Sequence, residues 1–289
     1  FDYNLLVIGG GSAGLVSAYI AAAVKAKVAL IEKHKMGGDC LNTGCVPSKA
    51  LIRSAKAADT LRHANRYGLE SVPVQGSFKN IMGRVKDIIA QVEPHDSPER
   101  YQQLGVDCIA GEASFISPWG LEVRHNDGRT ERLTARSIVV ATGGKPAIPP
   151  VPGLADMQPL HSDNLWDLQD QPQRLLVMGG GPIGCELAHA FARLGTDVVQ
   201  VEQGERVLAR EDADVSEVVH HQFARDGIDL RLGHRVTEFC HEDGEKVAYC
   251  DHNGQRVRIP FDQVLVAVGR AANTENLALD KIGIETLPN

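Results

Sequence analysis

Two glycine-rich segments of the same design constrain this sequence more than any other feature. Gly9–Gly14 (GGGSAG) and Gly179–Gly184 (GGGPIG) each follow a short apolar run and precede an Ala-containing, helix-favouring stretch. A second apolar run then ends in an acid, Glu32 or Glu202, 18 residues after the last glycine of its copy. Strand, glycine turn, helix, strand and carboxylate in this order are typical of a dinucleotide-binding unit. The sequence therefore predicts an α/β chain with two Rossmann-like dinucleotide-binding domains.

Each position in the repeated pattern has its own physical role. The first glycine permits a tight turn, the second lets the backbone approach a pyrophosphate, and the third lets the helix pack closely on the strand. The helix N-terminus favours phosphate, and the acid accepts hydrogen bonds from ribose hydroxyls. One GxGxxG motif alone is weak evidence, so the prediction rests on the repetition. The predicted contacts are Gly9, Gly11, Ser12, Ala13, Gly14 and Glu32 at the first turn, and Gly179, Gly181, Pro182, Ile183, Gly184 and Glu202 at the second.

The acid at the end of the second copy bears on the choice of pyridine nucleotide. A carboxylate at position 202 would bind a free 2′-hydroxyl and repel a 2′-phosphate, which favours NAD over NADP. Arg206 and Arg210 follow shortly after Glu202 and keep NADP open as the less favoured alternative.

Composition excludes several classes of protein. The net charge is −7, from 30 basic and 37 acidic residues without a block of like charges, so no nucleic-acid surface or polybasic tether is expected. No run of about 18 apolar residues is present to span a bilayer. Six cysteines are too few for a secreted disulfide scaffold. We expect a reducing compartment, the cytoplasm, and no metal site, because the histidines and cysteines show no ligand spacing.

The segment GGDCLNTGCVPSK contains two closely spaced cysteines, Cys40 and Cys45. On an ideal helix their Cα atoms would lie about 8 to 9 Å apart, whereas a disulfide needs about 4.4 to 6.8 Å, so a disulfide requires a non-helical turn. Asn42 and Gly44 tolerate such a turn. A helix that begins near Cys45 would favour its thiolate, and Lys49 would follow on the same face. From the residues alone, a redox disulfide and two inert thiols both stay open, and a metal site is the least favoured alternative because no second cysteine pair with zinc-type spacing lies nearby.

The remaining pattern predicts further elements and a division into domains. A proline-rich segment at 147–153 is unsuited to a helix or a central strand and predicts a crossing between domains. We expect a first domain over 1–150, a second over 151–269, and a return toward the first over 270–289. Helices are expected at 48–67 and 78–92, and strands at 106–115, 121–123, 137–141 and 264–268.

These motifs together resemble class I FAD- and pyridine-nucleotide-dependent disulfide oxidoreductases, the group of dihydrolipoamide dehydrogenase, glutathione reductase and mercuric reductase. GGDCLNTGCVPSK resembles the active-site segment of that family, GGGSAG its FAD site, IVVATG (138–143) a second FAD contact, and GGGPIG its nicotinamide-dinucleotide site. VAVGR (266–270) with Asn273 resembles its return strand. The resemblance implies further cofactor contacts from Lys33, Gly38, Asp39, Ala113, Thr142, Gly143 and Gly269. Asp39 stands where many members have threonine.

The resemblance also implies a mechanism. Reduced NAD would pass a hydride to FAD, and the flavin would reduce a disulfide of Cys40 and Cys45. Cys45 would be the thiolate beside the flavin, and Cys40 would exchange with a disulfide, small-molecule or metal-ion substrate; the reverse direction would carry electrons from dihydrolipoamide to NAD. Lys49 would lie beside the flavin with Glu186 as its acidic partner. The alternative for Glu186 is a solvated carboxylate in the first turn of a helix.

The family comparison raises expectations about the whole protein. The C-terminal interface domain of the family, with its catalytic histidine, is not in this sequence, so we expect a fragment of an enzyme that forms a homodimer through that domain. The resemblance also leaves open a membrane domain ahead of Phe1, which some bacterial relatives carry. The rival interpretation is a non-catalytic FAD- or NADH-binding module or redox sensor, against which the retained CxxxxC pair argues.

Overall fold

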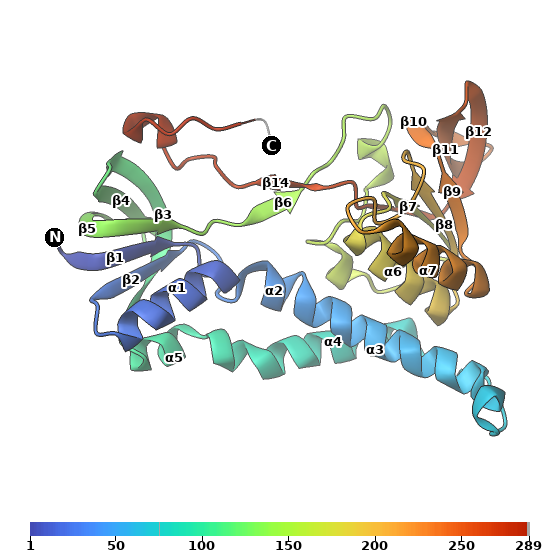
Figure 1. Ribbon diagram of the computed structural model, residues 1–289, viewed down its shortest axis with the longest axis horizontal. Helices are drawn as coiled ribbons and strands as arrows, with labels where there is room; N and C mark the ends of the chain where they lie inside the picture. The colour runs from blue at the N-terminus through green and yellow to red at the C-terminus, as the bar shows by residue number, and fades with distance from the viewer. Residues whose placement is uncertain (75, 288–289) are drawn as a thin grey trace. The chain divides into compact units, whose positions relative to one another are not determined.

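A computed structural model describes residues 1–74 and 76–287 and divides the chain into two compact units (Figure 1). The first unit contains residues 1–46, 87–145 and 271–289, and the second contains 47–86 and 146–270. Residues 47–86 thus group with the second unit, whereas the division drawn from the sequence put them in the first domain. That division at 150 and 269 stays a prediction.

The first unit contains four parallel strands in the order β5-β1-β2-β3 and a three-stranded antiparallel meander, β3-β4-β5. The long strands β3 and β5 belong to both: residues 106–110 of β3 pair with β2, and its later residues pair with β4. The pairing therefore closes on itself. The strands are β1 (Tyr3–Ile8), β2 (Val28–Glu32), β3 (Val106–Ser117), β4 (Gly120–His125) and β5 (Thr130–Val140).

Apolar runs in β1 and β2 are continuous because both faces of these strands are covered. Alternate residues such as Leu6 and Ile31 pack with the meander, where Phe115 and Leu121 are buried. The intervening residues pack with α1 (Ser12–Ala23) on the opposite face. This two-sided burial fixes the register of both strands and so places the turn that joins β1 to α1.

The first unit contains two short helices besides α1. Helix α2 (Gly38–Asn42) begins beside that turn, where Gly37 donates its backbone N–H to the Gly10 carbonyl at 2.8 Å. Helix α5 (Pro98–Gln103) packs on β3, and Ser97 caps it by accepting the backbone N–H of Arg100. The long helices α3 (Cys45–Arg62) and α4 (Phe78–Val92) carry the chain between the two units. Short 3₁₀ turns occur at η1 (Ala64–Tyr67), η2 (Glu93–Asp96) and η5 (Leu279–Ile282).

The second unit repeats the first arrangement around another parallel sheet, ordered β13-β7-β8-β9. A three-stranded antiparallel sheet, β10-β11-β12, packs on it through a buried core that includes Met178, Phe239 and Phe261. The elements are β7 (Arg174–Met178), α6 (Pro182–Leu194), β8 (Asp197–Glu202), α7 (Ala213–Arg225), β9 (Asp229–Leu232), β10 (Arg235–Glu242), β11 (Glu245–His252), β12 (Gln255–Phe261) and β13 (Gln263–Val266), with 3₁₀ turns η3 (Ala155–Met157) and η4 (Leu165–Asp167). The predicted pair of α/β dinucleotide-binding folds is confirmed.

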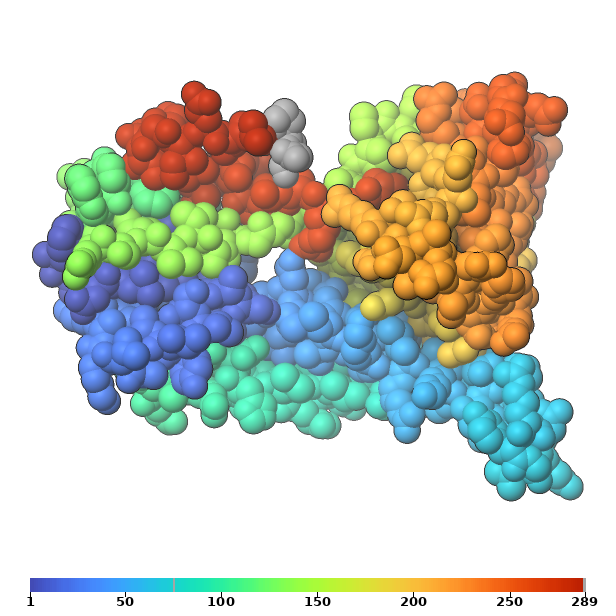
Figure 2. Space-filling model, in the orientation of Figure 1, coloured from blue at the N-terminus to red at the C-terminus, as the bar shows by residue number. Residues whose placement is uncertain are grey.

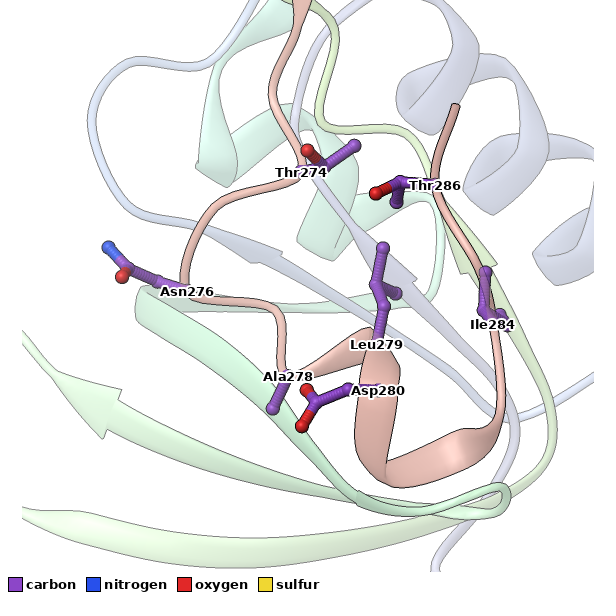
Figure 3. A pocket seen from close by; sticks show the side chains of 7 residues that line it. All are labelled: Thr274, Asn276, Ala278, Leu279, Asp280, Ile284 and Thr286. Atoms are coloured by element: carbon purple, nitrogen blue, oxygen red, sulfur yellow. The ribbon is translucent and has the colours of Figure 1, made fainter. Parts of the chain in front are cut away.

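The chain leaves the first unit at β6 (Gly144–Pro146) and returns at β14 (Arg270–Ala272), and these two strands pair. After its return the chain lies against the first unit (Figure 2) and packs on β3. There Phe115 donates its backbone N–H to the Leu277 carbonyl at 2.9 Å. A cavity of about 430 Å³ occurs in this returning segment and contains none of the predicted site residues (Figure 3). No described helix is both long and apolar enough to cross a bilayer.

Candidate dinucleotide and dithiol site

The turn between β1 and α1 requires glycine at its first and third positions. Gly9 has φ +107°, and a Cβ at Gly14 would lie 1.8 Å from the Gly9 carbonyl oxygen. The second position differs, because the nearest atom that a Cβ at Gly11 would meet is the Gly38 Cα at 3.7 Å. The backbone at Gly11 is therefore partly open for a ligand to approach, as the sequence pattern predicts.

The turn between β7 and α6 has the same geometry. Gly179 has φ +106°, and a Cβ at Gly184 would lie 2.3 Å from the Gly179 carbonyl oxygen. At Gly181 a Cβ would meet nothing within 4 Å. Both α1 and α6 lack a side-chain cap and an acid in the first turn, so nothing of their own competes with an anion at these N-termini. The residues of both turns fit a dinucleotide pyrophosphate.

The two strand-end acids hold their turns together in the same way. Glu32 accepts the backbone N–H groups of Gly10 at 2.6 Å and His34 at 2.7 Å, one on each carboxylate oxygen. Glu202 likewise accepts Gly180 at 2.6 Å and Gly204 at 2.7 Å. A carboxylate has about four acceptor positions, so each acid retains capacity for ribose hydroxyls. Binding of ribose by these acids stays a prediction, and fixing the turn is a role that the sequence pattern did not reveal.

The cysteine segment lies directly on the first turn. Gly38, at the start of α2, has φ +53°, and a Cβ there would lie 2.5 Å from the Gly11 Cα. The helix ends at Asn42, Thr43 leaves the helical region with φ −138°, and α3 begins at Cys45. The non-helical turn that a disulfide needs is therefore present between the two cysteines. Cys45 is exposed at the start of α3, and Cys40 is partly buried on α2.

The environment of Cys40 keeps its thiol protonated. A hydrogen bond with Cys45, followed by burial, raises the pKa of Cys40, and the nearby charges of Cys45 and Asp96 raise it further. The Ser12 hydroxyl opposes this effect through a hydrogen bond that lowers the pKa. Ser12 was expected to contact the cofactor, so its link to Cys40 is an additional role.

Asp96 is a residue of this site that sequence reasoning missed. It lies in η2, is partly buried, and burial raises the pKa of its carboxyl group. Its negative charge acts on Cys40 and on the buried Tyr101, whose pKa is raised first by its own burial and then by Asp96. An acid next to Ser97, the cap of α5, is the only feature of the sequence that could have drawn attention to Asp96. Nothing in the sequence connects residue 96 to residue 40.

Lys49 and Glu186 form the ion pair expected from the family resemblance. The Lys49 Nζ lies 2.8 and 2.7 Å from the two carboxylate oxygens of Glu186. Both side chains are well exposed, so the pair adds no more than about 1 kcal/mol to stability. The alternative position for Glu186 is wrong, because α6 begins at Pro182 and Glu186 lies beyond its first turn. The role of the pair beside a flavin stays a prediction.

The other predicted cofactor contacts fall in different environments. Thr142 and Asn273 exchange hydrogen bonds: the Thr142 hydroxyl donates to the Asn273 carbonyl, and the Asn273 amide donates to the Thr142 carbonyl. Gly143 accepts the backbone N–H of Asn273 at 3.0 Å and has φ +66°. These bonds tie the return strand to the end of β5. Gly269 has φ +150°, which suits glycine.

Three further predicted cofactor contacts have surroundings that do not point to a ligand. Ala113 is buried, and its methyl packs in the core formed with the meander. Lys33 lies 3.6 Å from the Glu112 carboxylate, and Asp39 is exposed in the first turn of α2. Their contacts with a cofactor stay predictions.

The cysteines outside the pair are packing residues. Burial raises the pKa of Cys108, Cys185 and Cys250 to about 11, so their thiols are protonated at neutral pH. Cys240 is partly buried, and its pKa is also raised. Among residues 1–74 and 76–287, no cluster of three or more metal-ligating side chains occurs.

Comparison with known proteins identifies the family. Residues 3–289 match the family described as pyridine nucleotide-disulphide oxidoreductase. The chain belongs to this family. Its members are FAD-dependent oxidoreductases that also use a pyridine nucleotide.

Individual relatives agree with this assignment. A mercuric reductase of Staphylococcus aureus is 33% identical over 285 residues, which are 99% of this chain and 51% of the relative. A dihydrolipoyl dehydrogenase of Chlamydia muridarum is 35% identical over 301 residues, 98% of this chain and 60% of the relative. Among solved structures, the Cu(II) complex of the HOCl-induced flavoprotein disulfide reductase RclA from Escherichia coli has a TM-score of 0.84 at 27% identity, covering 100% of this chain and 61% of that one. This chain spans about half to three fifths of these proteins.

Proposed function

We propose that this chain holds the nucleotide-binding and dithiol part of a flavoprotein oxidoreductase that passes electrons from NADH to Cys40 and Cys45. The contact between Gly38 and Gly11 carries the proposal, because it packs the cysteine segment on the first dinucleotide turn. When bound there, FAD would supply a carrier that accepts hydride from a reduced nicotinamide. The two cysteines would store the electron pair, since a disulfide that gains two electrons and two protons becomes a dithiol.

The residues around the pair would give the two sulfurs different roles. Cys45 lies at the N-terminus of α3, where the helix dipole stabilises negative charge, whereas the raised pKa of Cys40 keeps that sulfur protonated. Cys40 would attack a substrate only after losing that proton. Lys49, held by Glu186, would offer a fixed positive charge where negative charge develops on the bound cofactor.

The proposed donor is NADH rather than NADPH. The carboxylate of Glu202 ends β8, where it would repel a 2′-phosphate. Arg206 is turned into its own loop: Nη2 donates to the Ala209 carbonyl at 3.0 Å, and Nη1 is buried. One of its N–H groups is therefore used within the loop rather than for a ligand. We expect NADH to bind at least about tenfold more tightly than NADPH, and titration of the protein with each nucleotide measures the ratio.

The substrate class that fits an exchanging thiol is a disulfide or a soft metal ion. Relatives named mercuric reductase, dihydrolipoyl dehydrogenase and disulfide reductase act on such groups. We further propose that this chain faces the cytoplasm, that the full-length protein is a homodimer, and that any membrane domain lies ahead of Phe1. Cell fractionation and native mass spectrometry of the full-length protein test these three points.

An anaerobic absorption titration tests the central proposal. The FAD-loaded protein should bleach partly with one equivalent of NADH and gain a long-wavelength band from a thiolate beside the flavin. Cys45→Ser should lose that band and the storage of two further electrons, while Cys250→Ser, at a buried packing cysteine, should keep both. Bleaching that is the same in the Cys45→Ser and unaltered proteins would instead favour the nucleotide-binding sensor.

A further inference from the structure

Gln200 is a polar residue in strand β8, two residues before Glu202, and it is fully buried. Its Nε2 donates to the Gly179 carbonyl oxygen at 2.8 Å, while its Oε1 is buried with no hydrogen-bond partner. Leaving a buried polar atom unpaired costs about 1 to 3 kcal/mol. A hydrophobic residue would avoid that cost, so the amide must contribute something that packing does not.

The amide and the acid of β8 hold the two ends of one peptide group. The carbonyl of Gly179 and the N–H of Gly180 belong to the same peptide plane. Gln200 binds its carbonyl, and Glu202 binds its N–H at 2.6 Å. Residues 200 and 202 are two apart on a strand and so project to the same side. We call this pair of contacts the peptide clamp.

The first turn offers an internal comparison. Glu32 holds the N–H of Gly10 at the same distance of 2.6 Å, and the backbone bond from Gly9 to Ile31 matches that from Gly179 to Val201, both 2.8 Å. The position that corresponds to Gln200 is Leu30, which has no donor. The first turn therefore forms without the amide, and Gln200 is an addition to the second turn only.

A peptide between two glycines needs such a restraint because glycine tolerates both signs of φ. Rotation of the Gly179–Gly180 peptide would exchange the directions of its N–H and C=O groups. The carbonyl oxygen, which points to Gly184 at the start of α6, would then leave that position and face the carboxylate of Glu202, which accepts the N–H in the observed turn.

We infer that Gln200 is a positioning residue that pre-orders the second turn for the pyrophosphate of the pyridine nucleotide. The inference rests on the proposed function, because it assigns that turn to NADH. When the turn already has the conformation that binds the nucleotide, less free energy is lost in ordering it, so the nucleotide binds more tightly. Cys185 lies at the same place, where its Sγ donates to the Gly180 carbonyl at 3.4 Å, and supports the turn from the helix side.

The test uses the 289-residue chain with Gln200→Met, which keeps the length of the side chain and removes the amide, and Gln200→Leu, which copies position 30. We expect the Kd for NADH and for ADP-ribose to rise about three- to tenfold, in line with one lost hydrogen bond. FAD binding should not change. Val198→Ala is the matched control, since Val198 is equally buried on β8 but pairs with Leu175, near the start of β7, whereas the turn follows the end of β7; it should lower stability without raising these Kd values.

Hydrogen exchange of the nucleotide-free protein gives a second readout. The peptide that covers Val177–Leu187 should exchange faster in Gln200→Met and not in Val198→Ala. Unchanged Kd values together with unchanged exchange would overturn the inference. If the unaltered protein binds no NADH at all, the proposed function fails, and the exchange rates still decide whether the clamp orders the turn.

Discussion

The Lys49 ammonium bridges both carboxylate oxygens of Glu186, although each side chain is largely exposed to solvent. An exposed ion pair contributes little to folding, so its symmetric geometry is more useful for fixing a charge than for stability.

Neutralising the partner of Lys49 should therefore affect electron transfer more than folding. We expect Glu186→Gln to slow reduction of bound flavin by NADH about tenfold, because the lysine charge loses its fixed position, while the free energy of unfolding changes by less than about 1 kcal/mol. Stopped-flow absorbance measures the rate. Asp167→Asn, which breaks the similar exposed Lys86–Asp167 pair at 3.1 Å, should leave it unchanged. A rate equally slow in both variants would contradict the assigned role.

The pH dependence of Cys40 reactivity should depend on Asp96. The negative carboxylate raises the pKa of Cys40, so Asp96→Asn should lower that pKa and move the alkylation curve to lower pH. We expect iodoacetamide to label Cys40 about two- to fivefold faster at neutral pH in the reduced variant, as followed by mass spectrometry. Glu99→Gln is the control, because Glu99 acts on Cys108. No shift in Asp96→Asn would show that the carboxylate is too well screened to matter.

Alanine at the second glycine of each turn should separate ligand binding from folding. At Gly181 a Cβ meets no protein atom within 4 Å, and φ is −76°, so Gly181→Ala should fold normally. It should nevertheless weaken NADH binding about tenfold or more, because the methyl group occupies the space that the pyrophosphate needs. Gly11→Ala should do the same for FAD. Calorimetric titration measures both, and Gly83→Ala in α4, which also meets nothing, should alter neither.

Alanine at the third glycine should instead damage the fold. A Cβ at Gly184 would lie 2.3 Å from the Gly179 carbonyl oxygen, so α6 must move away from β7. We expect Gly184→Ala to destabilise the second unit by about 2 kcal/mol or more, seen as a lower midpoint in urea unfolding. A midpoint equal to that of Gly181→Ala would mean that the turn relaxes more easily than its geometry indicates.

The sequence pattern predicted the parts of this fold that follow local rules. Helix α4 has the predicted bounds and strand β8 ends at the predicted acid, Glu202, because apolar periodicity and motif spacing define them. The antiparallel strands β10 to β12 and the helix α7 were not predicted, since their partners are set by tertiary packing.

The candidate site divides in the same way. Motif spacing identified Cys40, Cys45 and the glycine turns, whose chemistry lies within a few residues along the chain. The roles of Asp96 and Gln200 were not predicted because they depend on neighbours that are distant in sequence. Asp96 acts on Cys40, and Gln200 binds the Gly179 carbonyl. No local pattern reports such contacts.

The closure of the first unit by its last segment has a consequence for synthesis on the ribosome. Phe115 is covered by Leu277, which emerges only after all residues of the second unit have been made. Domains fold as units during translation, so the second unit can finish folding while the nascent first unit still waits for its final segment. Until then residues 111–117 of β3, which pair with β4 but not with β2, lack the contacts of the returning segment, so this side of the strand stays open for pairing while the second unit is made.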